Sequence, residues 1–392
     1  MDLTLPPRAV LPEDGTAGTL IARVWVPGKA AGPVVAVLRA DGVHAFGREV
    51  PTASDLMETP DPAKLAQSAP TTRLGSFEEI LANSEMGPRD PAKPHFLAPI
   101  DLQAIKAAGV TFMRSLLERV IEEQAKGNPA AAEQVRQTLA REIGADLGSV
   151  KPGSDSAMRL KDALIARKLW SQYLEVGIGP DAEIFTKAQP MAAVGTGAEI
   201  GLHPKSIWNN PEPEVVLVAN SRGEIVGATL GNDVNLRDFE GRSALLLSKA
   251  KDNNGSCAVG PFIRLFDATF GLDDVRQTVV SLRVEGDDQF VLQGRSSMSE
   301  ISRDPAELVA QMMGAINQYP DGVVLYCGTM FAPTEDRGKK GDGFTHKPGD
   351  IVTISAPKLG ALVNRVNRSD RIAPWNFGTR ALMRNLAARG LL

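Results

Sequence analysis

At residues 211–218 the chain reads Pro211-Glu212-Pro213-Glu214-Val215-Val216-Leu217-Val218, and at residues 231–238 it reads Gly231-Asn232-Asp233-Val234-Asn235-Leu236-Arg237-Asp238. Between these segments, two β-branched runs are joined by Asn220-Ser221-Arg222-Gly223, a composition typical of a β-hairpin. Side chains two residues apart on a strand point to the same side, so Glu212 and Glu214 project together. Because the hairpin returns the second strand, we expect Asp233 to reach the same open end.

Three carboxylates placed in this way repel one another unless a cation neutralises them. A set of oxygen ligands suits Mg²⁺, Mn²⁺ or Ca²⁺ and leaves coordination positions open for water and a substrate. From spacing alone a second interpretation stays open, in which the two glutamates are solvated on an edge strand and Asp233 caps a turn.

The composition of the 392-residue chain, with 43% hydrophobic and 23% charged residues, is that of an ordinary globular protein. Its formal net charge of −4 gives no reason to expect nucleic acid or an anionic membrane as a partner. No apolar run is long enough to span a bilayer, and the N-terminus lacks the order of a secretion signal, so we expect a cytoplasmic protein. Two cysteines exclude a disulfide framework and a Cys-rich zinc site, and four histidines far apart in sequence disfavour a His-built metal site.

We expect a fold of the α+β class that is mainly β and has two domains. Strand-like runs separated by turns predict a smaller β-rich N-terminal domain over residues 1–90, followed by a catalytic domain over residues 91–392. The region of about 100–173 has helical periodicity, with residues 109–112 as a possible strand, and predicts a helical insertion or lid. Within it, Asn128-Pro129 begins a helix that Gly144 ends. The remainder predicts short antiparallel strands with few helices.

Lys251 precedes a small apolar segment that ends in Gly260-Pro261. An amine buried there beside a cation has a lowered pKa and can take a proton from the carbon next to a carbonyl group. The alternative of a lysine on a surface loop stays open from the residues alone. Gly328-Thr329 ends another predicted strand, where the backbone and the hydroxyl are placed to hold a carboxylate.

Taken together, these segments resemble the fumarylacetoacetate hydrolase superfamily over about residues 181–366. The resemblance rests on an ordered set of motifs: Glu-x-Glu, Asn-Asp-Val-x-x-Arg-Asp, a lysine with Gly-Pro nine residues after it, Gly-Thr, and Lys347-Pro348-Gly349-Asp350-Ile351-Val352. It implies a mixed β-roll in a homodimer or higher homo-oligomer, with an extra N-terminal domain in longer members. It also implies that Glu212, Glu214 and Asp233 bind a divalent metal such as Mg²⁺, that Lys251 is catalytic, and that Thr329 contacts the substrate carboxylate.

Within the superfamily, the chain looks like the branch of bacterial 2-keto-3-deoxypentonate dehydratases of the xylonate and arabinonate routes. Hydrolases of the superfamily carry a His and a Glu on a lid helix, whereas residues 109–119 contain no His and resemble the Thr-aromatic…Ser…Arg pattern of the dehydratases. Glu183, ahead of Phe185 and Lys187, is similar to the second catalytic group of that branch.

The resemblance therefore implies dehydration of a small 2-oxo acid, a five-carbon 2-keto-3-deoxy sugar acid, to 2-oxoglutarate semialdehyde. Lys251 is expected to remove the C3 proton and Glu183 to protonate the departing C4 hydroxyl, and the two roles can be exchanged. Ser115, Arg119 and Lys187 are expected to contact the polar tail or the carboxylate of the substrate.

Two other functions stay open. One is a hydrolase that cleaves a C–C bond of acylpyruvates or diketo acids, and the other is a metal-stabilised binding or structural protein without catalysis. From the residues alone, Glu183 is equally interpreted as a solvated loop carboxylate and Arg119 as a surface or salt-bridge residue. Asn254 stands where many members of the superfamily have Asp, and we expect this departure to affect Lys251 or substrate contacts.

Overall fold

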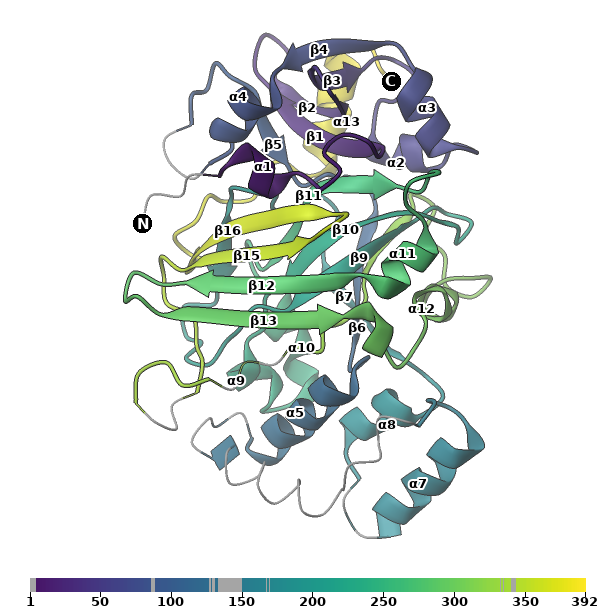
Figure 1. Ribbon diagram of the computed structural model, residues 1–392, viewed down its shortest axis with the longest axis vertical. Helices are drawn as coiled ribbons and strands as arrows, with labels where there is room; N and C mark the ends of the chain where they lie inside the picture. Colours follow the sequence, from purple (N-terminus) through teal and green to yellow (C-terminus); the bar gives the residue numbers. More distant parts are fainter. Residues whose placement is uncertain are drawn as a thin grey trace.

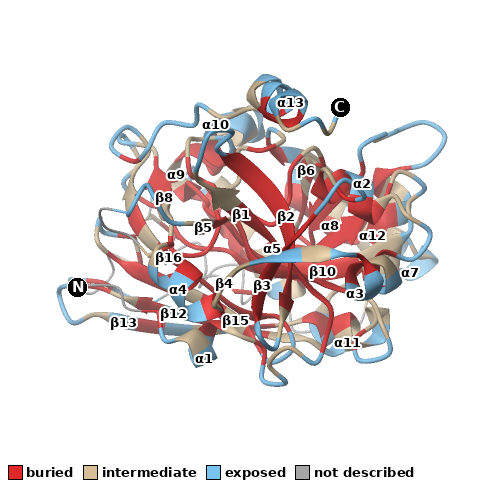
Figure 2. Cartoon of the chain, turned by 90° about the horizontal axis from the view of Figure 1, so that it is seen from above, coloured by how far each residue is buried: buried red, intermediate tan, exposed pale blue. Residues whose placement is uncertain are grey.

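The computed structural model describes residues 5–85, 89–126, 128, 131–132, 150–166, 168, 170–331, 333, 335–339 and 343–392. In this part of the chain two β-sheets form the centre of the molecule, and their strands are largely buried, whereas exposed residues gather in the peripheral loops and helices (Figures 1 and 2). The helix predicted from Asn128-Pro129 to Gly144 lies almost wholly outside the described residues.

The larger sheet runs from the N-terminal strands to the strands of the predicted hairpin. In spatial order it contains β4 (Thr71–Gly75), β3 (Gly42–Phe46), β2 (Gly32–Arg39), β1 (Leu20–Val26), β11 (Cys257–Leu265), β10 (Ile225–Asp233), β9 (Pro213–Ala219), β14 (Val323–Tyr326), β6 (Ala104–Gly109) and β7 (Glu183–Ala188), with β5 (His95–Leu97) paired to β1. Only the β14–β6 pair within it is parallel among the described strands. The N-terminal strands thus share a hydrogen-bonded sheet with the rest of the chain, and the division into domains 1–90 and 91–392 stays a prediction.

The smaller sheet packs against the middle of the larger one. Its strands, in spatial order, are β13 (Val291–Ser297), β12 (Val279–Glu285), β15 (Ile351–Ala356), β16 (Gly360–Arg368) and β8 (Glu199–Leu202). Strands β9, β10 and β11 contact β12, β15 and β16 across an apolar core that includes Val215, Leu217, Leu230 and Leu362. The prediction of a mainly β fold with mixed strand directions is confirmed.

The helices lie at the two ends and the edges of the sheets (Figure 1). They are α1 (Pro7–Val10), α2 (Ala53–Met57), α3 (Pro62–Ser68), α4 (Phe77–Ala82), α5 (Met113–Gln124), α7 (Asp155–Ala166), α8 (Gln172–Ile178), α9 (Arg237–Glu240), α10 (Leu247–Lys251), α11 (Leu272–Gln277), α12 (Pro305–Met312) and α13 (Thr379–Ala388), with 3₁₀ turns at Ala244–Leu246 and Met298–Glu300. In the predicted helical block, the first segment is divided. Residues 104–109 form β6 because they pair with β14 on one side and β7 on the other, and α5 begins only after them.

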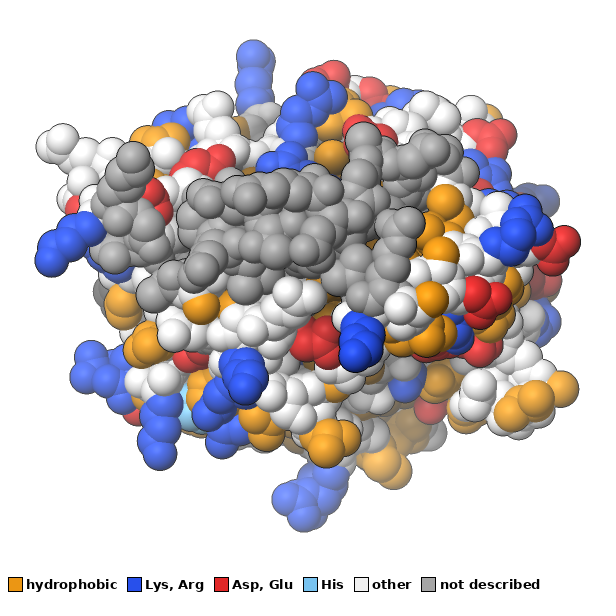
Figure 3. Space-filling view, turned by 90° about the horizontal axis from the view of Figure 1, so that it is seen from below, with side chains coloured by type: hydrophobic (Ala, Val, Ile, Leu, Met, Phe, Trp, Pro, Cys, Tyr) orange, Lys and Arg blue, Asp and Glu red, His pale blue; other side chains and the backbone are white. Residues whose placement is uncertain are grey.

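Helices α5, α7 and α8 pack together below the sheets in Figure 1, at the end where α9 and α10 also lie. On the face seen from this side, basic, acidic and apolar side chains are interspersed around the grey atoms (Figure 3). Within the described residues, no helix combines the length and the apolar character needed to cross a membrane.

Candidate active site

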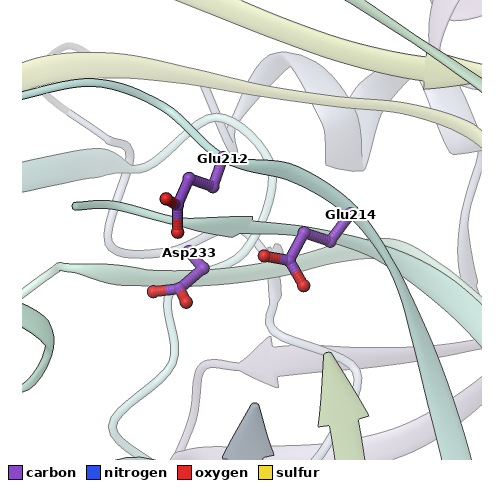
Figure 4. A group of neighbouring side chains, drawn as sticks. All are labelled: Glu212, Glu214 and Asp233. Atoms are coloured by element: carbon purple, nitrogen blue, oxygen red, sulfur yellow. The ribbon is translucent and has the colours of Figure 1, made fainter. Parts of the chain in front are cut away.

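The three predicted carboxylates converge at the open end of the β9–β10 hairpin. Glu214 lies opposite Gly231 in the strand register, and the backbone N–H of Asp233 donates to the carbonyl oxygen of Glu212 at 3.1 Å. Each of the three side chains offers an oxygen within 4.8 Å of the others, and all three residues are buried. Figure 4 shows the three side chains close together, with Glu212 just before β9, Glu214 on β9 and Asp233 at the end of β10. The predicted convergence is therefore confirmed, and the interpretation of solvated edge-strand glutamates is wrong.

Two cations from other elements contact Glu212. The Lys251 ammonium, at the end of α10, lies 2.5 Å from one oxygen of Glu212 and 3.0 Å from Asp233 Oδ2. The Arg119 guanidinium, from α5, donates to the other oxygen of Glu212. Burial lowers the pKa of Lys251, but Asp233, Glu212 and Glu240 together raise it above its usual value. Burial and a nearby cation predict a lowered pKa, but in this structure the carboxylates around the amine outweigh its burial.

These groups line a cavity together with most of the predicted site residues. Its wall contains Ser115, Arg119, Glu183, Glu212, Glu214, Asp233, Lys251 and Thr329, joined by Asn210, Phe185, Glu118, Glu122, Arg237 and Glu240. No histidine lines it within the described part of the chain. The lining side chains include seven carboxyl groups and three cationic groups, so acidic side chains outnumber basic ones in the wall.

A buried ion-pair network fixes the helical side of the cavity. Arg119 lies 2.7 Å from Glu122 and 3.1 Å from Glu240. Arg237, at the start of α9, donates to Glu122 at 2.7 Å and to Glu118 at 3.3 Å, and its guanidinium stacks on the Trp208 ring at 4.3 Å. Each of these buried guanidinium groups pairs with at least two carboxylates, and the several partners together fix its orientation. Arg119 is thus a salt-bridge residue that also faces the cavity.

Sequence reasoning missed most of this network. Arg237 could have been predicted as a site residue, because it is the arginine of the Asn-Asp-Val-x-x-Arg-Asp motif. Glu118 and Glu122 carry a weaker signal, since they are one helical turn apart on the segment that also carries Arg119. Nothing in the local sequence indicates that α5 faces α9.

Glu183, the first residue of β7, is half-buried at the cavity wall. No described residue makes a hydrogen bond or ion pair with its carboxyl group. Burial, followed by the negative charge of Glu240, raises the pKa of Glu183 to about 7, although Arg119 and Lys251 act in the opposite direction. A carboxyl group with a pKa near 7 can hold or release a proton at neutral pH, as a general acid or base must.

The neighbouring strand leaves room for the Glu183 side chain because it carries glycine there. Gly109 on β6 pairs with Glu183, and a Cβ at Gly109 would lie 2.1 Å from Glu183 Oε2. We expect Gly109→Ala to displace the carboxyl group and, if Glu183 takes part in proton transfer as predicted, to lower kcat by about 10²-fold, the effect of moving a reacting group by about 1 Å. The matched control is Gly271→Ala, where an added Cβ meets nothing within 4 Å. Steady-state kinetics of both variants check this, and equal kcat values would contradict it.

The remaining predicted residues differ in their placement. Thr329 follows Gly328, whose N–H donates to Glu214 Oε2 at 2.6 Å, and the Thr329 hydroxyl accepts from the N–H of Phe331. The Ser115 hydroxyl donates to the carbonyl oxygen of Phe112. Lys187 is absent from the cavity wall, because its fully buried ammonium lies behind Asp233, 2.9 Å from Oδ1, and also donates to the carbonyl oxygen of Lys251.

Asn254 points away from the cavity. Its amide nitrogen donates to the carbonyl oxygens of Ser369 at 3.3 Å and Ala373 at 3.1 Å, in the segment before α13. An ionised Asp has no proton to donate to these carbonyl oxygens. Asn in place of Asp at position 254 therefore allows hydrogen bonds to the C-terminal segment, and its side chain forms no hydrogen bond with Lys251 in the described part of the chain.

The electrostatics of the three carboxylates suit a bound cation. Burial, with the added charge of Asp233 and Glu212, raises the pKa of Glu214 well above its usual value. Burial also raises the pKa of Asp233, but Lys187 and Lys251 lower it below its usual value. The Lys187 ammonium lies 2.9 Å from Asp233 Oδ1, and the Lys251 ammonium lies 3.0 Å from Asp233 Oδ2. A ligand set made of oxygen atoms alone, in a wall with seven carboxyl groups and three cationic groups, fits a hard divalent ion.

Comparison with known proteins agrees with this geometry. The family described as fumarylacetoacetate (FAA) hydrolase, C-terminal, matches residues 163–367, more than half of the chain. The chain belongs to the fumarylacetoacetate hydrolase family. All the residues of the β9–β10 carboxylate group, together with Lys251 and Thr329, lie inside the matched region, whereas α5 with Ser115 and Arg119 precedes it.

Two curated relatives are named as dehydratases, as the predicted branch resemblance implies. The chain is 33% identical over 193 residues to 2-dehydro-3-deoxy-D-arabinonate dehydratase of Saccharolobus solfataricus, a match that covers 48% of this chain and only 60% of that relative. It is 27% identical over 313 residues to the probable 2-keto-3-deoxyxylonate dehydratase of Haloferax volcanii, covering 80% and 89% of the two chains.

A solved structure shares the fold. It is 2-keto-3-deoxy-D-arabinonate dehydratase complexed with magnesium and 2,5-dioxopentanoate, which is 21% identical to this chain. The match has a TM-score of 0.60 and covers 89% of this chain and 99% of that one. The predicted fold of the fumarylacetoacetate hydrolase type is thereby confirmed.

Proposed function

We propose that this protein dehydrates a five-carbon 2-keto-3-deoxy sugar acid to 2,5-dioxopentanoate, also called 2-oxoglutarate semialdehyde. One observation carries the proposal: three buried carboxylates converge beside Lys251, in a cavity that also holds a carboxyl group with a pKa near 7 and contains no histidine in the described residues. The names of the two relatives and the ligands named for the solved structure support the same assignment.

Glu212, Glu214 and Asp233 would hold a divalent ion, for which Mg²⁺ is the first candidate. When bound, such an ion polarises the 2-oxo group of a chelating substrate and stabilises the negative charge that develops there after proton loss at C3. Lys187 keeps Asp233 in place from behind, and the Gly328 N–H keeps Glu214 in place from the side. The protein thus orients its donor oxygens before any substrate arrives.

Lys251 and Glu183 would carry the two proton transfers. Lys251 takes the proton from C3, the C–O bond at C4 breaks, and Glu183 gives its proton to the departing hydroxyl, so that one water leaves. Transfer of a proton from C5 to C3 then converts the unsaturated product into the enol of the aldehyde. Each positioned group is expected to contribute about 10²–10⁴-fold to the rate. Glu212 and Asp233 raise the pKa of Lys251 through their negative charge. A divalent ion bound to them would offset part of that charge and so would lower the pKa of Lys251 toward a value suited to a base.

The cavity wall supplies the remaining contacts. Arg119, held by Glu122 and Glu240, presents a fixed guanidinium on the helical side, suited to an oxygen of the substrate. Thr329 and Ser115 place hydroxyl groups at the wall, and Thr329 lies beside Glu214 through Gly328. Phe185 lies 5.8 Å below the Lys251 ammonium and gives that part of the wall an apolar surface.

The pH dependence tests the role of Glu183. Its raised pKa means that the acid form predominates below about 7 and is lost as the pH rises through that value. If Glu183 is the acid, kcat/KM falls on the alkaline side of a transition near pH 7, and the Glu183→Gln variant loses this transition together with about 10²–10⁴-fold of the rate. The groups that face Glu183 and set the position of the transition are Glu240, Arg119, Lys251 and Glu212. A loss of rate on the acid side instead would exchange the roles of Glu183 and Lys251.

The proposal itself is tested by incubating the protein with Mg²⁺ and each stereoisomer of 2-keto-3-deoxypentonate and measuring formation of the semialdehyde. Turnover of at least one isomer that stops on adding a chelator is the expected result. Cleavage of an acylpyruvate, without turnover of any sugar acid, would assign the protein to the hydrolases instead. That outcome is disfavoured by the absence of a histidine from the described cavity wall.

A further inference from the structure

Asn210 stands just before the carboxylate segment and is fixed in position by its backbone. Its N–H donates to the carbonyl oxygen of Asn235 and its own carbonyl oxygen accepts from the N–H of Asn235, both at 3.0 Å. The residue is only 3% exposed, and it lines the same cavity as Glu183 and Lys251. Asn210 is thus a rigidly held polar residue at the wall of the proposed active site, without a role in the chemistry derived above.

The orientation of its side-chain amide follows from one neighbour. The amide nitrogen donates to the carbonyl oxygen of Pro211 at 2.9 Å. Since that carbonyl oxygen can only accept, the nitrogen must face it, and the amide oxygen must take the other position. The amide oxygen of Asn210 is buried and accepts no hydrogen bond from any described residue. A buried acceptor without a hydrogen bond is unfavourable, so a ligand that donates a hydrogen bond to it binds more tightly.

Several other polar groups of the wall already have partners within the protein. The hydroxyl of Ser115 donates to a backbone carbonyl group, and that of Thr329 accepts from a backbone N–H. Glu122 is ion-paired with Arg119 and Arg237, and Glu212 with Arg119 and Lys251. The Asn210 oxygen, by contrast, belongs to a buried side chain that is fixed by its amide nitrogen, and it is a neutral acceptor whose hydrogen-bonding capacity is unused. Its natural counterpart is a hydroxyl group of the ligand.

We propose that Asn210 determines specificity by accepting a hydrogen bond from the terminal hydroxyl at C5 of the substrate. This inference rests on the proposed function and adds the group by which the enzyme distinguishes a sugar acid from a simple hydroxy-oxo acid. The C4 hydroxyl leaves as water and needs a proton donor, which an amide oxygen is not. The C5 hydroxyl stays on the carbon chain, and its O–H can donate a hydrogen bond.

The experiment compares 2-keto-3-deoxypentonate with its 5-deoxy analogue, 4-hydroxy-2-oxopentanoate, which can still lose water to give a conjugated 2-oxo-3-enoate. We expect kcat/KM of the unmodified enzyme to be about ten- to a hundredfold lower for the analogue, the range that corresponds to an unpaired buried acceptor. In Asn210→Ala, kcat/KM for the sugar acid should fall by about the same factor, whereas the value for the analogue should change less than about threefold.

The matched control is Asn235→Ala. Asn235 is the backbone partner of Asn210, is equally buried and also has side-chain atoms without partners, but it does not line the cavity. Asn235→Ala is expected to change kcat/KM by the same factor for both substrates. If Asn210→Ala also lowered kcat/KM by the same factor for both substrates, its effect would be purely structural, and this result would overturn the inference. Equal kcat/KM values for the two substrates in the unmodified enzyme would overturn it even if Asn210→Ala does not fold. Absence of turnover with every sugar acid would instead overturn the proposed function and, with it, this inference.

Discussion

Replacing Lys251 by methionine is expected to lower kcat by about 10²–10⁴-fold, the contribution of one positioned proton-transfer group. Methionine keeps the unbranched shape of the side chain in its buried position at the end of α10 but removes the ammonium group. That group lies within 2.5 Å of Glu212 and 3.0 Å of Asp233, beside the proposed metal position, and no other described lysine lines the cavity. Steady-state kinetics at saturating Mg²⁺ measure the loss.

The same helix offers a control for this substitution. Lys249 is exposed, and its ammonium lies over the ring of Phe239 at 5.5 Å, outside the cavity wall. Lys249→Met should retain kcat within about twofold, as expected of a surface substitution. Circular dichroism of both variants shows whether the fold is retained. Undiminished turnover by a folded Lys251→Met protein would remove Lys251 from the mechanism.

Replacing Glu214 by glutamine is expected to weaken Mn²⁺ binding by at least about 10²-fold, the upper end of the effect of changing an outer-shell partner of a metal ligand. Glutamine retains an oxygen that accepts from the Gly328 N–H, so the local backbone contact can persist. What is lost is the negative charge, and a hard cation depends on that charge for its affinity. Isothermal titration calorimetry with Mn²⁺ gives the affinity, and turnover should fall with it.

Glu224 provides the matched control, because it lies at the other end of the β9–β10 hairpin. It is exposed, and its carboxylate accepts hydrogen bonds from the side chains of Asn220 and Arg222 in the turn. Glu224→Gln should bind Mn²⁺ with unchanged affinity. If Glu214→Gln bound Mn²⁺ as tightly as the unmodified protein, the proposed ligand set would be incorrect.

The part of the site that depends on local strand geometry could be predicted from the sequence. Alternation along β9 and the hairpin turn at 220–223 suffice to bring Glu212, Glu214 and Asp233 together, because both constraints act between residues near in sequence. The resemblance of ordered motifs then placed Lys251, Glu183 and Thr329 in the same cavity, and the structure brings them there.

The part that depends on how distant elements meet could not be predicted. The pairing of Arg237 with Glu118 and Glu122 requires α9 to face α5, and no local pattern encodes that contact. Lys187 has the same two-residue phase along β7 as Glu183 and Phe185 of the cavity wall, yet its ammonium lies behind Asp233. The raised pKa of Lys251 was likewise not foreseeable, since it depends on the number of carboxylates that surround the amine in three dimensions.

The most direct test of the metal site is anomalous diffraction from crystals soaked in Mn²⁺ and pyruvate, a 2-oxo acid that can chelate an ion but has no C4 hydroxyl to lose. The proposed site predicts a strong anomalous peak bound by Glu212, Glu214 and Asp233, with the carboxylate and 2-oxo oxygens of pyruvate completing its coordination. An anomalous map without a peak among these three side chains, or pyruvate bound away from the ion, would contradict it.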